Sequence, residues 1–247
     1  MPRFFVTPDK IQDGIAVLEG DGAHHISYAL RMAVGEEITL CDGQGSTYRC
    51  RLLEMDGETV KATVLEKIQD DGELPTKIYL YQGYPKADKL EFIIQKAVEI
   101  GAHAVIPFES SRCIKRPKAD KIEHTVSRQN KIAQEAAKQC GRAILPTVTP
   151  PVSFSEMLAE CKKHSLALFC YEGKGPLFIR ERLKALPKDA LPDSIAVVIG
   201  SEGGFSPEEA KEAEKAGLLM TGLGGRILRC ETASLYALSV ISSFLEP

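Results

Sequence analysis

The 247-residue sequence lacks the features that direct a chain into or across a membrane. No uninterrupted apolar run approaches the ~18 residues that a membrane-spanning helix needs. The N-terminal segment MPRFFVTPDK has no apolar stretch of the kind that signal peptides carry. These two absences predict a cytoplasmic protein that has no contact with a membrane.

The sequence also lacks the spacings of a disulfide framework or a metal site. Its seven cysteines, an odd number, are scattered from Cys41 to Cys230 without a C-x-x-C pair, which is typical of reduced thiols. No helical metal-ligand spacing relates the five histidines, which are His24, His25, His103, His124 and His164. We therefore expect no metal.

The charge is nearly balanced overall but unevenly distributed. A formal net charge of −3 counts against a polycation that binds nucleic acid over its whole surface. Between Arg112 and Lys131, however, seven Lys or Arg stand against two acids. A solvated helix face explains many such runs, yet this excess would also suit a phosphate backbone.

The first 70 residues are typical of a small β-rich module. Period-two segments at 37–42, 47–54 and 59–66 are separated by the turns GQGS and Asp56-Gly57, which are hairpin signals. A helix is expected around His24–Met32. We predict a barrel-like module over residues 1–70, followed by the polar linker Ile68–Pro75.

From residue 76 to 247, strand and helix patterns alternate. KIYLYQG, AVIPF, LALFCY and IAVVIG are expected strands, and an amphipathic helix ends at Gly101. Ser153-x-x-Glu156 and Ser206-Pro207-Glu208-Glu209 are helix starts. The alternation predicts an α/β domain, a mostly parallel sheet covered by helices.

Two glycine clusters follow expected strands of this second half. VVIGSEGGFSPEE places Gly200, Gly203 and Gly204 before a helix, and Gly222, Gly224 and Gly225 precede the last helix. Glycine lets backbone approach a ligand closely, and small molecules usually bind at strand ends of α/β sheets. A tight strand-to-helix turn without a ligand would also explain either cluster by itself.

Three ligand classes compete for these loops. A P-loop requires G-x-x-x-x-G-K-[ST], and neither cluster has the Lys-Ser/Thr. A dinucleotide site requires a further strand and an acidic residue about 20 positions on, but only one helix follows Gly224. S-adenosylmethionine, with a sulfonium cation, tolerates the nearby Glu202, although the chemistry alone does not select it.

The paired motifs decide between these classes by resemblance. G-S-E-G-G-F-S-x-x-E followed by L-G-x-R-I-L-R-x-E-T-A resembles the C-terminal motifs of the SPOUT class of methyltransferases. More narrowly, it resembles the bacterial 16S ribosomal RNA uridine-N3 methyltransferase family. The opening PRFFV, IIQKAVEIG, SRCIK and IAQEAAKQCGR also match, so the resemblance covers essentially the whole chain. Gly225, Cys230 and Ser234 depart from the residues expected in relatives.

The resemblance implies a SPOUT-type α/β domain with a deep trefoil knot, a PUA-like RNA-binding β-barrel at the N-terminus, and a homodimer. It implies that S-adenosylmethionine binds among the loops 169–172, 199–204 and 223–233. The cofactor-binding residues expected from it are Cys170, Tyr171, Ile199, Gly200, Glu202, Gly203, Leu223, Gly224, Ile227, Leu228, Arg229, Thr232 and Ala233.

The implied reaction requires the N3–H proton of uridine to leave, because the neutral imide nitrogen has no free lone pair. Arg226 or Arg229 would supply positive charge near the base oxygens, and we expect Arg229 to be the electrostatic stabiliser. Glu202 or Glu231 would accept the proton, directly or through water. A salt bridge from the arginines to Glu231 that only fixes the loop is the structural alternative.

Two other functions remain open at the level of sequence: a non-catalytic RNA-binding assembly factor and a nucleotide-dependent oxidoreductase. For RNA, in 16S ribosomal RNA or the small ribosomal subunit, we expect contacts from Arg3, Arg31, Arg112, Lys115, Arg116 and Lys118. The last helix has no charge between Thr232 and Leu245 and is apolar on most sides. Such a helix is normally buried on most sides, so it independently predicts a homodimer.

Overall fold

The computed structural model describes residues 1–69, 72–86, 89–114, 119–173, 177–187 and 190–246. Two compact units make up the chain. The N-terminal unit comprises Met1–Glu73 together with Ala137–Leu145, and the C-terminal unit comprises Leu74–Ala136 and Pro146–Pro247. Among the described residues, no helix is long and apolar enough to cross a membrane.

The N-terminal unit is built on a six-stranded sheet in the order β1-β4-β5-β6-β3-β2. Only the β1–β4 pairing is parallel. One face buries an apolar cluster that includes Phe4, Ile26 and Leu40. The strands are β1 Arg3–Phe5, β2 Ile11–Gln12, β3 Ile15–Glu19, β4 Glu37–Cys41, β5 Thr47–Met55 and β6 Thr59–Ile68.

Both predicted hairpin turns of this unit are confirmed. Asp42 accepts hydrogen bonds from the amides of Gln44 and Ser46, at 2.8 and 2.9 Å, between β4 and β5. Asp56 does the same for the amides of Glu58 and Thr59 before β6. The helix expected around His24–Met32, with Asp21 near its start, does begin at Asp21 but ends earlier than expected: α1 spans Asp21–His24, and a π-helical turn follows over His25–Ala29.

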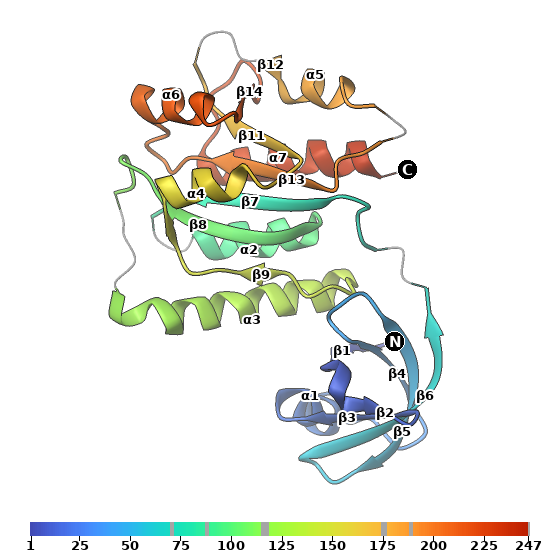
Figure 1. The fold of residues 1–247 in the computed structure, drawn as a ribbon. Coiled ribbons are helices and arrows are strands. Elements are labelled where there is room, and N and C mark those ends of the chain that lie inside the picture. The colour runs from blue at the N-terminus through green and yellow to red at the C-terminus, as the bar shows by residue number, and fades with distance from the viewer. Residues whose placement is uncertain (70–71, 87–88, 115–118, 174–176, 188–189, 247) are drawn as a thin grey trace. The chain divides into compact units, whose positions relative to one another are not determined.

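The C-terminal unit has an eight-stranded sheet in which every described pairing is parallel. The order is β10-β8-β7-β13-β11-β14-β12, and β9 pairs with β8. The strands are β7 Lys77–Gly83, β8 Ala102–Glu109, β9 Thr147–Val148, β10 Val152–Ser153, β11 Leu166–Cys170, β12 Leu177–Phe178, β13 Ser194–Ile199 and β14 Leu219–Gly222. The predicted parallel α/β architecture is confirmed (Figure 1).

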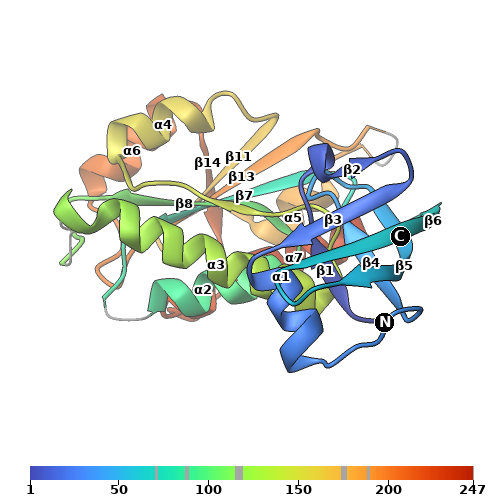
Figure 2. The ribbon, with the colours of Figure 1, turned by 90° about the horizontal axis from the view of Figure 1, so that it is seen from below.

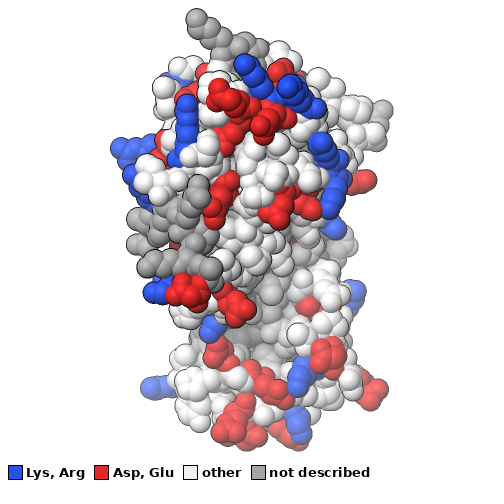
Figure 3. Space-filling model, turned by 60° about the vertical axis from the view of Figure 1, so that its left-hand side comes forward, with Lys and Arg blue, Asp and Glu red and all other residues white. Residues whose placement is uncertain are grey.

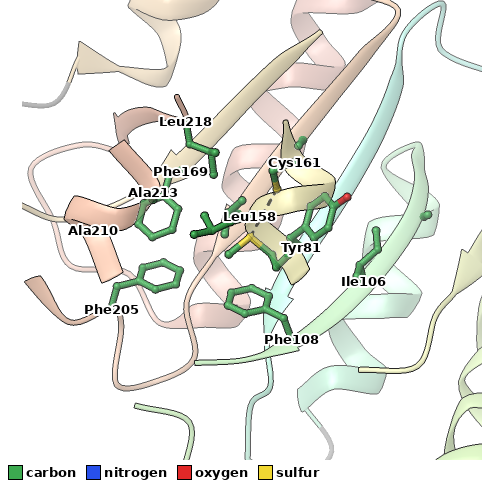
Figure 4. Packing of buried hydrophobic residues seen from close by; sticks show 14 residues of the cluster. Tyr81, Ile106, Phe108, Leu158, Cys161, Phe169, Phe205, Ala210, Ala213 and Leu218 are labelled. Atoms are coloured by element: carbon green, nitrogen blue, oxygen red, sulfur yellow. Dashed lines mark hydrogen bonds between the residues drawn. The ribbon is translucent and has the colours of Figure 1, made fainter. Parts of the chain in front are cut away.

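Helices cover both faces of this sheet, with α4 and α6 on one face and α2 and α7 on the other (Figure 2). On the first face, Phe205 lies against Phe169, with ring centroids 4.2 Å apart, and stacks on Phe108 (Figure 4). The helices are α2 Lys89–Glu99, α3 Ile122–Cys140, α4 Phe154–Cys161, α5 Ile179–Lys184, α6 Pro207–Lys215 and α7 Cys230–Leu245.

Local capping explains where α4 and α6 begin and where α2 ends. Ser153 forms the predicted capping box with Glu156, and Ser206, predicted as the cap before Pro207, forms a capping box with Glu209; each hydroxyl accepts from the amide three residues later. The glycine expected after α2, Gly101, has φ +102°, a conformation that glycine adopts at little cost.

The strands near the β12 edge of the sheet are not in sequence order. From β11 the chain runs to β12, which pairs with β14, then through α5, and only then to β13 in the middle of the sheet. The later helix α7 packs against β7, β13 and α5. It therefore contacts both the sheet and the earlier connection through α5. The trefoil knot that the resemblance implies stays a prediction.

Candidate active site

A cavity of about 850 Å³ lies at the carboxyl ends of β11, β13 and β14. Because parallel strands end at the same edge of a sheet, both glycine clusters reach this edge together with the N-terminus of α7. A cavity of this size lies within the range of small-molecule sites. The geometry thus brings the two sequence-distant clusters into one site.

The first glycine loop, 200–204, needs its glycines because protein backbone passes close to them. A Cβ on Gly203 would lie 2.9 Å from both the Cβ and the carbonyl oxygen of Arg112. A Cβ on Gly83, at the end of β7, would lie 2.5 Å from the Ser201 amide nitrogen. Buried Phe205 then anchors the loop in the core. This loop is a packed element of the scaffold.

A buried amide network holds the same loop against α7. Gln82, fully buried on β7, donates to the Gly200 carbonyl at 3.2 Å and accepts from the Ser234 hydroxyl at 2.5 Å. Ser234 also donates to the Cys230 carbonyl one turn earlier in α7. Since a buried polar side chain must be satisfied, Gln82 fixes the spacing between β7, the first loop and α7.

The second glycine loop, 222–229, is open toward the cavity. A Cβ on Gly224 or Gly225 would meet no atom within 4 Å, although Gly224 has φ +126°. Ile227 is 85% exposed. In the described part of the chain, the exposed guanidinium groups of Arg226 and Arg229 have no ion pair. The alternative in which these arginines pair with Glu231 is therefore wrong for this structure.

Glu231 instead pairs with a lysine that the sequence analysis missed. The Lys89 ammonium, at the start of α2, lies 3.2 Å from a carboxylate oxygen of Glu202 and 3.2 Å from one of Glu231. Partial burial opposes ionisation of both carboxyls. Hydrogen bonds nevertheless lower their pKa values, including bonds from the Lys86 amide to Glu202 and from Lys89 to each. Both acids are therefore ionised at neutral pH.

Twelve of the thirteen predicted cofactor-binding residues line the cavity, and Thr232 is not among the lining residues. Of the expected catalytic residues, Arg229 and Glu202 line the cavity. Glu231 is not a lining residue but pairs with Lys89, which is one. Lining residues outside the predicted cofactor set are Lys89, Glu172, Gly173, Phe178, Ser201, Gly204, Phe205, Gly222, Gly225, Arg226 and Cys230. The roles of all these residues stay predictions.

The residues expected to contact RNA are spread over both units. Arg112 is exposed in the C-terminal unit and donates to the Gly203 carbonyl at 3.2 Å. Arg31 is exposed in the N-terminal unit, with φ +51°, and the Arg3 guanidinium lies 3.4 Å from the Cys41 sulfur. Lys115, Arg116 and Lys118 lie outside the described residues.

Other parts of the basic run and the N-terminal unit are less suited to RNA. Arg142 is 5% exposed and holds Glu73 through two hydrogen-bonding nitrogens, and Arg128 pairs with Glu91. Residues 1–73 carry seven Lys or Arg against fourteen Asp or Glu. Acidic side chains gather over this unit on the face drawn in Figure 3. Any RNA contact by the N-terminal unit must therefore be local.

The residues of the cavity fit S-adenosylmethionine. The open glycines of the second loop leave room for close backbone approach, and the apolar side chains of Ile199, Leu223 and Leu228 can cover an adenine ring. The carboxylates of Glu172 and Glu202 suit a cationic sulfonium. Neither glycine loop has the Lys-Ser/Thr of a P-loop.

Comparisons with known proteins agree with this assignment. A family model described as an RNA methyltransferase domain matches residues 72–242, and one described as an RNA methyltransferase PUA domain matches residues 18–65. The ribosomal RNA small subunit methyltransferase E of Bacillus subtilis (strain 168) is 36% identical over 249 residues, covering 98% of this chain and 96% of that protein.

Two solved structures are similar over nearly the whole chain. A ribosomal RNA small subunit methyltransferase E from Neisseria gonorrhoeae, bound to S-adenosyl methionine, is 30% identical with a TM-score of 0.84, covering 98% of this chain and 97% of that one. A putative methyltransferase from Legionella pneumophila, with bound cofactor SAM, is 28% identical with a TM-score of 0.84, covering 98% and 96%. The predicted fold class, a SPOUT-type α/β domain with a PUA-like module, is confirmed.

Proposed function

Because this chain belongs to the family of ribosomal RNA small subunit methyltransferase E, we propose that it methylates N3 of a uridine in 16S ribosomal RNA. S-adenosylmethionine is the methyl donor. The observation that carries the proposal is the meeting of both glycine loops, ionised carboxylates, and arginines that have no ion pair in the described chain, all around one cavity. A ribosomal RNA substrate places the reaction in the cytoplasm.

The side chains around the cavity divide the work of the reaction. When bound, S-adenosylmethionine supplies a methyl group on a positively charged sulfur. The Arg229 guanidinium, exposed and free of an acidic partner in the described chain, stabilises negative charge on the base oxygens as N3–H ionises. Of the two expected proton acceptors, Glu202 is the one that lines the cavity, and it accepts the proton, directly or through water. The glycine loops position the reacting groups.

Recognition of RNA uses positive side chains close to the cavity. Arg112 contacts the first glycine loop, so a phosphate bound there lies beside the site. Neutralising Lys115, Arg116 and Lys118 should weaken RNA binding and flatten its dependence on salt, without changing cofactor affinity. Neutralising Arg128, which already pairs with Glu91, is the matched control. An unchanged salt slope in the triple variant would contradict this part of the proposal.

The active form is a homodimer in this proposal. Within one subunit, α7 is more fully covered than its sequence predicts, because β7, β13, α2 and α5 all pack against it. Ile241 is fully buried, so Ile241→Glu tests folding and not assembly. The partly exposed Tyr236, Leu235 and Val240, with Phe92 of the adjacent α2 at 46% exposure, remain for a partner subunit.

Light scattering tests the dimer. Tyr236→Glu should yield monomers and abolish methylation, whereas Leu53→Glu, at a site 45% exposed in the N-terminal unit, should change neither property. A wild-type protein that is monomeric and fully active at the assay concentration would exclude the obligate dimer.

Methyl transfer is tested with ribosomal RNA from a strain that lacks the protein. The purified protein and labelled S-adenosylmethionine should introduce one methyl group per small subunit, identified by mass spectrometry as 3-methyluridine. Calorimetry should show binding of S-adenosylhomocysteine. RNA binding without cofactor binding or methyl transfer would favour a non-catalytic assembly factor, and nicotinamide or flavin binding would favour an oxidoreductase.

A further inference from the structure

Charged side chains from three separate segments meet at the edge of the cavity. Lys89 begins α2, Glu202 belongs to the first glycine loop, and Glu231 lies in the first turn of α7. One ammonium serves both carboxylates, at 3.2 Å from each. The side chains are 33%, 25% and 20% exposed, so solvent screens the cluster only in part.

Additional donors support the carboxylates from outside the pair. The Lys86 amide donates to both oxygens of Glu202, at 3.0 and 3.3 Å, and the Cys230 thiol donates to Glu231 at 3.2 Å. Within the described residues, no second ammonium or guanidinium pairs with either carboxylate. The other charged groups that line the cavity are Glu172, Arg226 and Arg229.

Building on the methyltransferase function proposed above, we propose that Lys89 is a positioning residue for the reaction. It keeps Glu202 and Glu231 ionised and holds the first glycine loop and the start of α7 together at the cavity. Lys89 acts through these two carboxylates. Without the ammonium, the negative charges of Glu202 and Glu231 would lie close together with no positive charge between them. Repulsion would then drive one carboxylate to take up a proton or to move away.

The direction of the pH effect follows from these contacts. In the wild-type protein, hydrogen bonds and the ammonium outweigh partial burial and lower the pKa of both carboxyls. Removing the ammonium deletes one of these effects and raises the pKa of each carboxyl. Both carboxyls are then ionised over a narrower range of pH. A reaction that needs the ionised pair therefore loses its rate at a higher pH when the solution is acidified.

The chain offers a close control on the same helix. Lys96 is also in α2, its side chain is 35% exposed against 33% for Lys89, and it pairs with Glu99 at 2.8 Å. The variants are therefore K89M, which removes the charge, K89R, which retains it, and K96M, which removes an equivalent charge that serves a different carboxylate.

The main readout is titration of the glutamate side-chain carbons by NMR in the ligand-free protein, with E202Q and E231Q for assignment. We expect both carboxyls to titrate below ordinary glutamate in the wild type and about one pH unit higher in K89M. The acid limb of the methylation profile should move upward by the same amount. K89R should restore both properties, and K96M should leave both unchanged.

Unchanged glutamate titrations and an unchanged acid limb in K89M would overturn the proposal. If K89M does not fold, the wild-type titration decides: Glu202 and Glu231 titrating at or above the ordinary value would overturn it equally. Failure of the proposed function looks different, because a wild type without methyl transfer at any pH leaves the carboxyl titrations of wild type and K89M measurable.

Discussion

The two glycine loops around the cavity look alike in sequence and differ in what their glycines face. In the first loop, Gly203 is confined by Arg112 and Gly200 by the turn that leads to Phe205. In the second, Gly224 and Gly225 face open space. Close packing of backbone explains the first cluster, whereas the open surroundings of the second fit the proposed access for a ligand. Substitution can therefore separate two reasons for glycine at this site: close packing of backbone in the first loop and open space in the second.

The largest loss of stability is expected from substitution of Gly83, against which the backbone of the first glycine loop packs. Gly83→Ala would place a methyl group 2.5 Å from the Ser201 nitrogen and 2.9 Å from the Gly200 carbonyl carbon, so backbone must shift. We expect a loss of about 3 kcal/mol in the free energy of unfolding, measured by urea denaturation. Gly225→Ala, with no neighbour within 4 Å, is the control. Equal stability of the two variants would remove the distinction between the loops.

In the second loop, the largest expected effect is on catalysis. Arg229→Ala should lower kcat about 100-fold, equivalent to ~2.7 kcal/mol, because a donor to the developing negative charge is lost. The thermal midpoint should change little, since Arg229 is exposed and has no ion pair in the described chain. Arg226→Ala serves as the comparison. A larger loss of kcat in Arg226→Ala would transfer the stabilising role to that residue.

Gly203→Val should affect both ligand affinity and stability. The sequence predicts at least a tenfold loss of S-adenosylhomocysteine affinity, about 1.4 kcal/mol. The Arg112 contact adds that the folded state is also destabilised, since the new side chain meets backbone. Calorimetry and thermal denaturation measure the two effects. Lowered affinity with unchanged stability would mean that the segment around Arg112 moves aside without lowering the free energy of unfolding.

Gly224→Val should reduce the same affinity tenfold with a smaller loss of stability. Its added side chain enters open space, and the remaining strain comes from φ +126°, which a β-branched residue adopts poorly. Gly225→Val has the same open surroundings without a positive φ and should change affinity less than about threefold. A similar tenfold loss in Gly225→Val would assign the effect to occupied volume.

The parts of the fold that could be predicted are those specified by nearby residues. The capping box at Ser153, the cap at Ser206, the Gly101 helix end and the amphipathic character of α2 were predicted correctly, because periodicity and caps act within a few residues. The two-residue strands β9, β10 and β12 were missed. Segments this short carry no period, and their pairing depends on partners elsewhere in the sheet.

Site prediction failed where the partner is distant in sequence. Lys89 stands at the start of a helix like any surface lysine, and its partners follow more than about a hundred residues later. Gln82 lies within a strand that the sequence predicts to be buried, but its partners belong to the first glycine loop and α7. The thirteen residues taken from the family resemblance carry this long-range information, which explains why most of them line one cavity.

The assignment of Ala137–Leu145 to the N-terminal unit has a consequence for the order of events during synthesis. Its sheet is fully translated at Ile68, yet the Arg142 partner of Glu73 and the Ile144 bridge to Gly43 follow some 70 residues later. A nascent chain emerging N-terminus first therefore exposes an incomplete unit while β7, α2, β8 and most of α3 are made. The N-terminal unit becomes complete only when Leu145 has been made, at a point where β7, α2 and β8 of the following sheet exist but β11, β13 and β14 do not, so both units are partly built at once during synthesis.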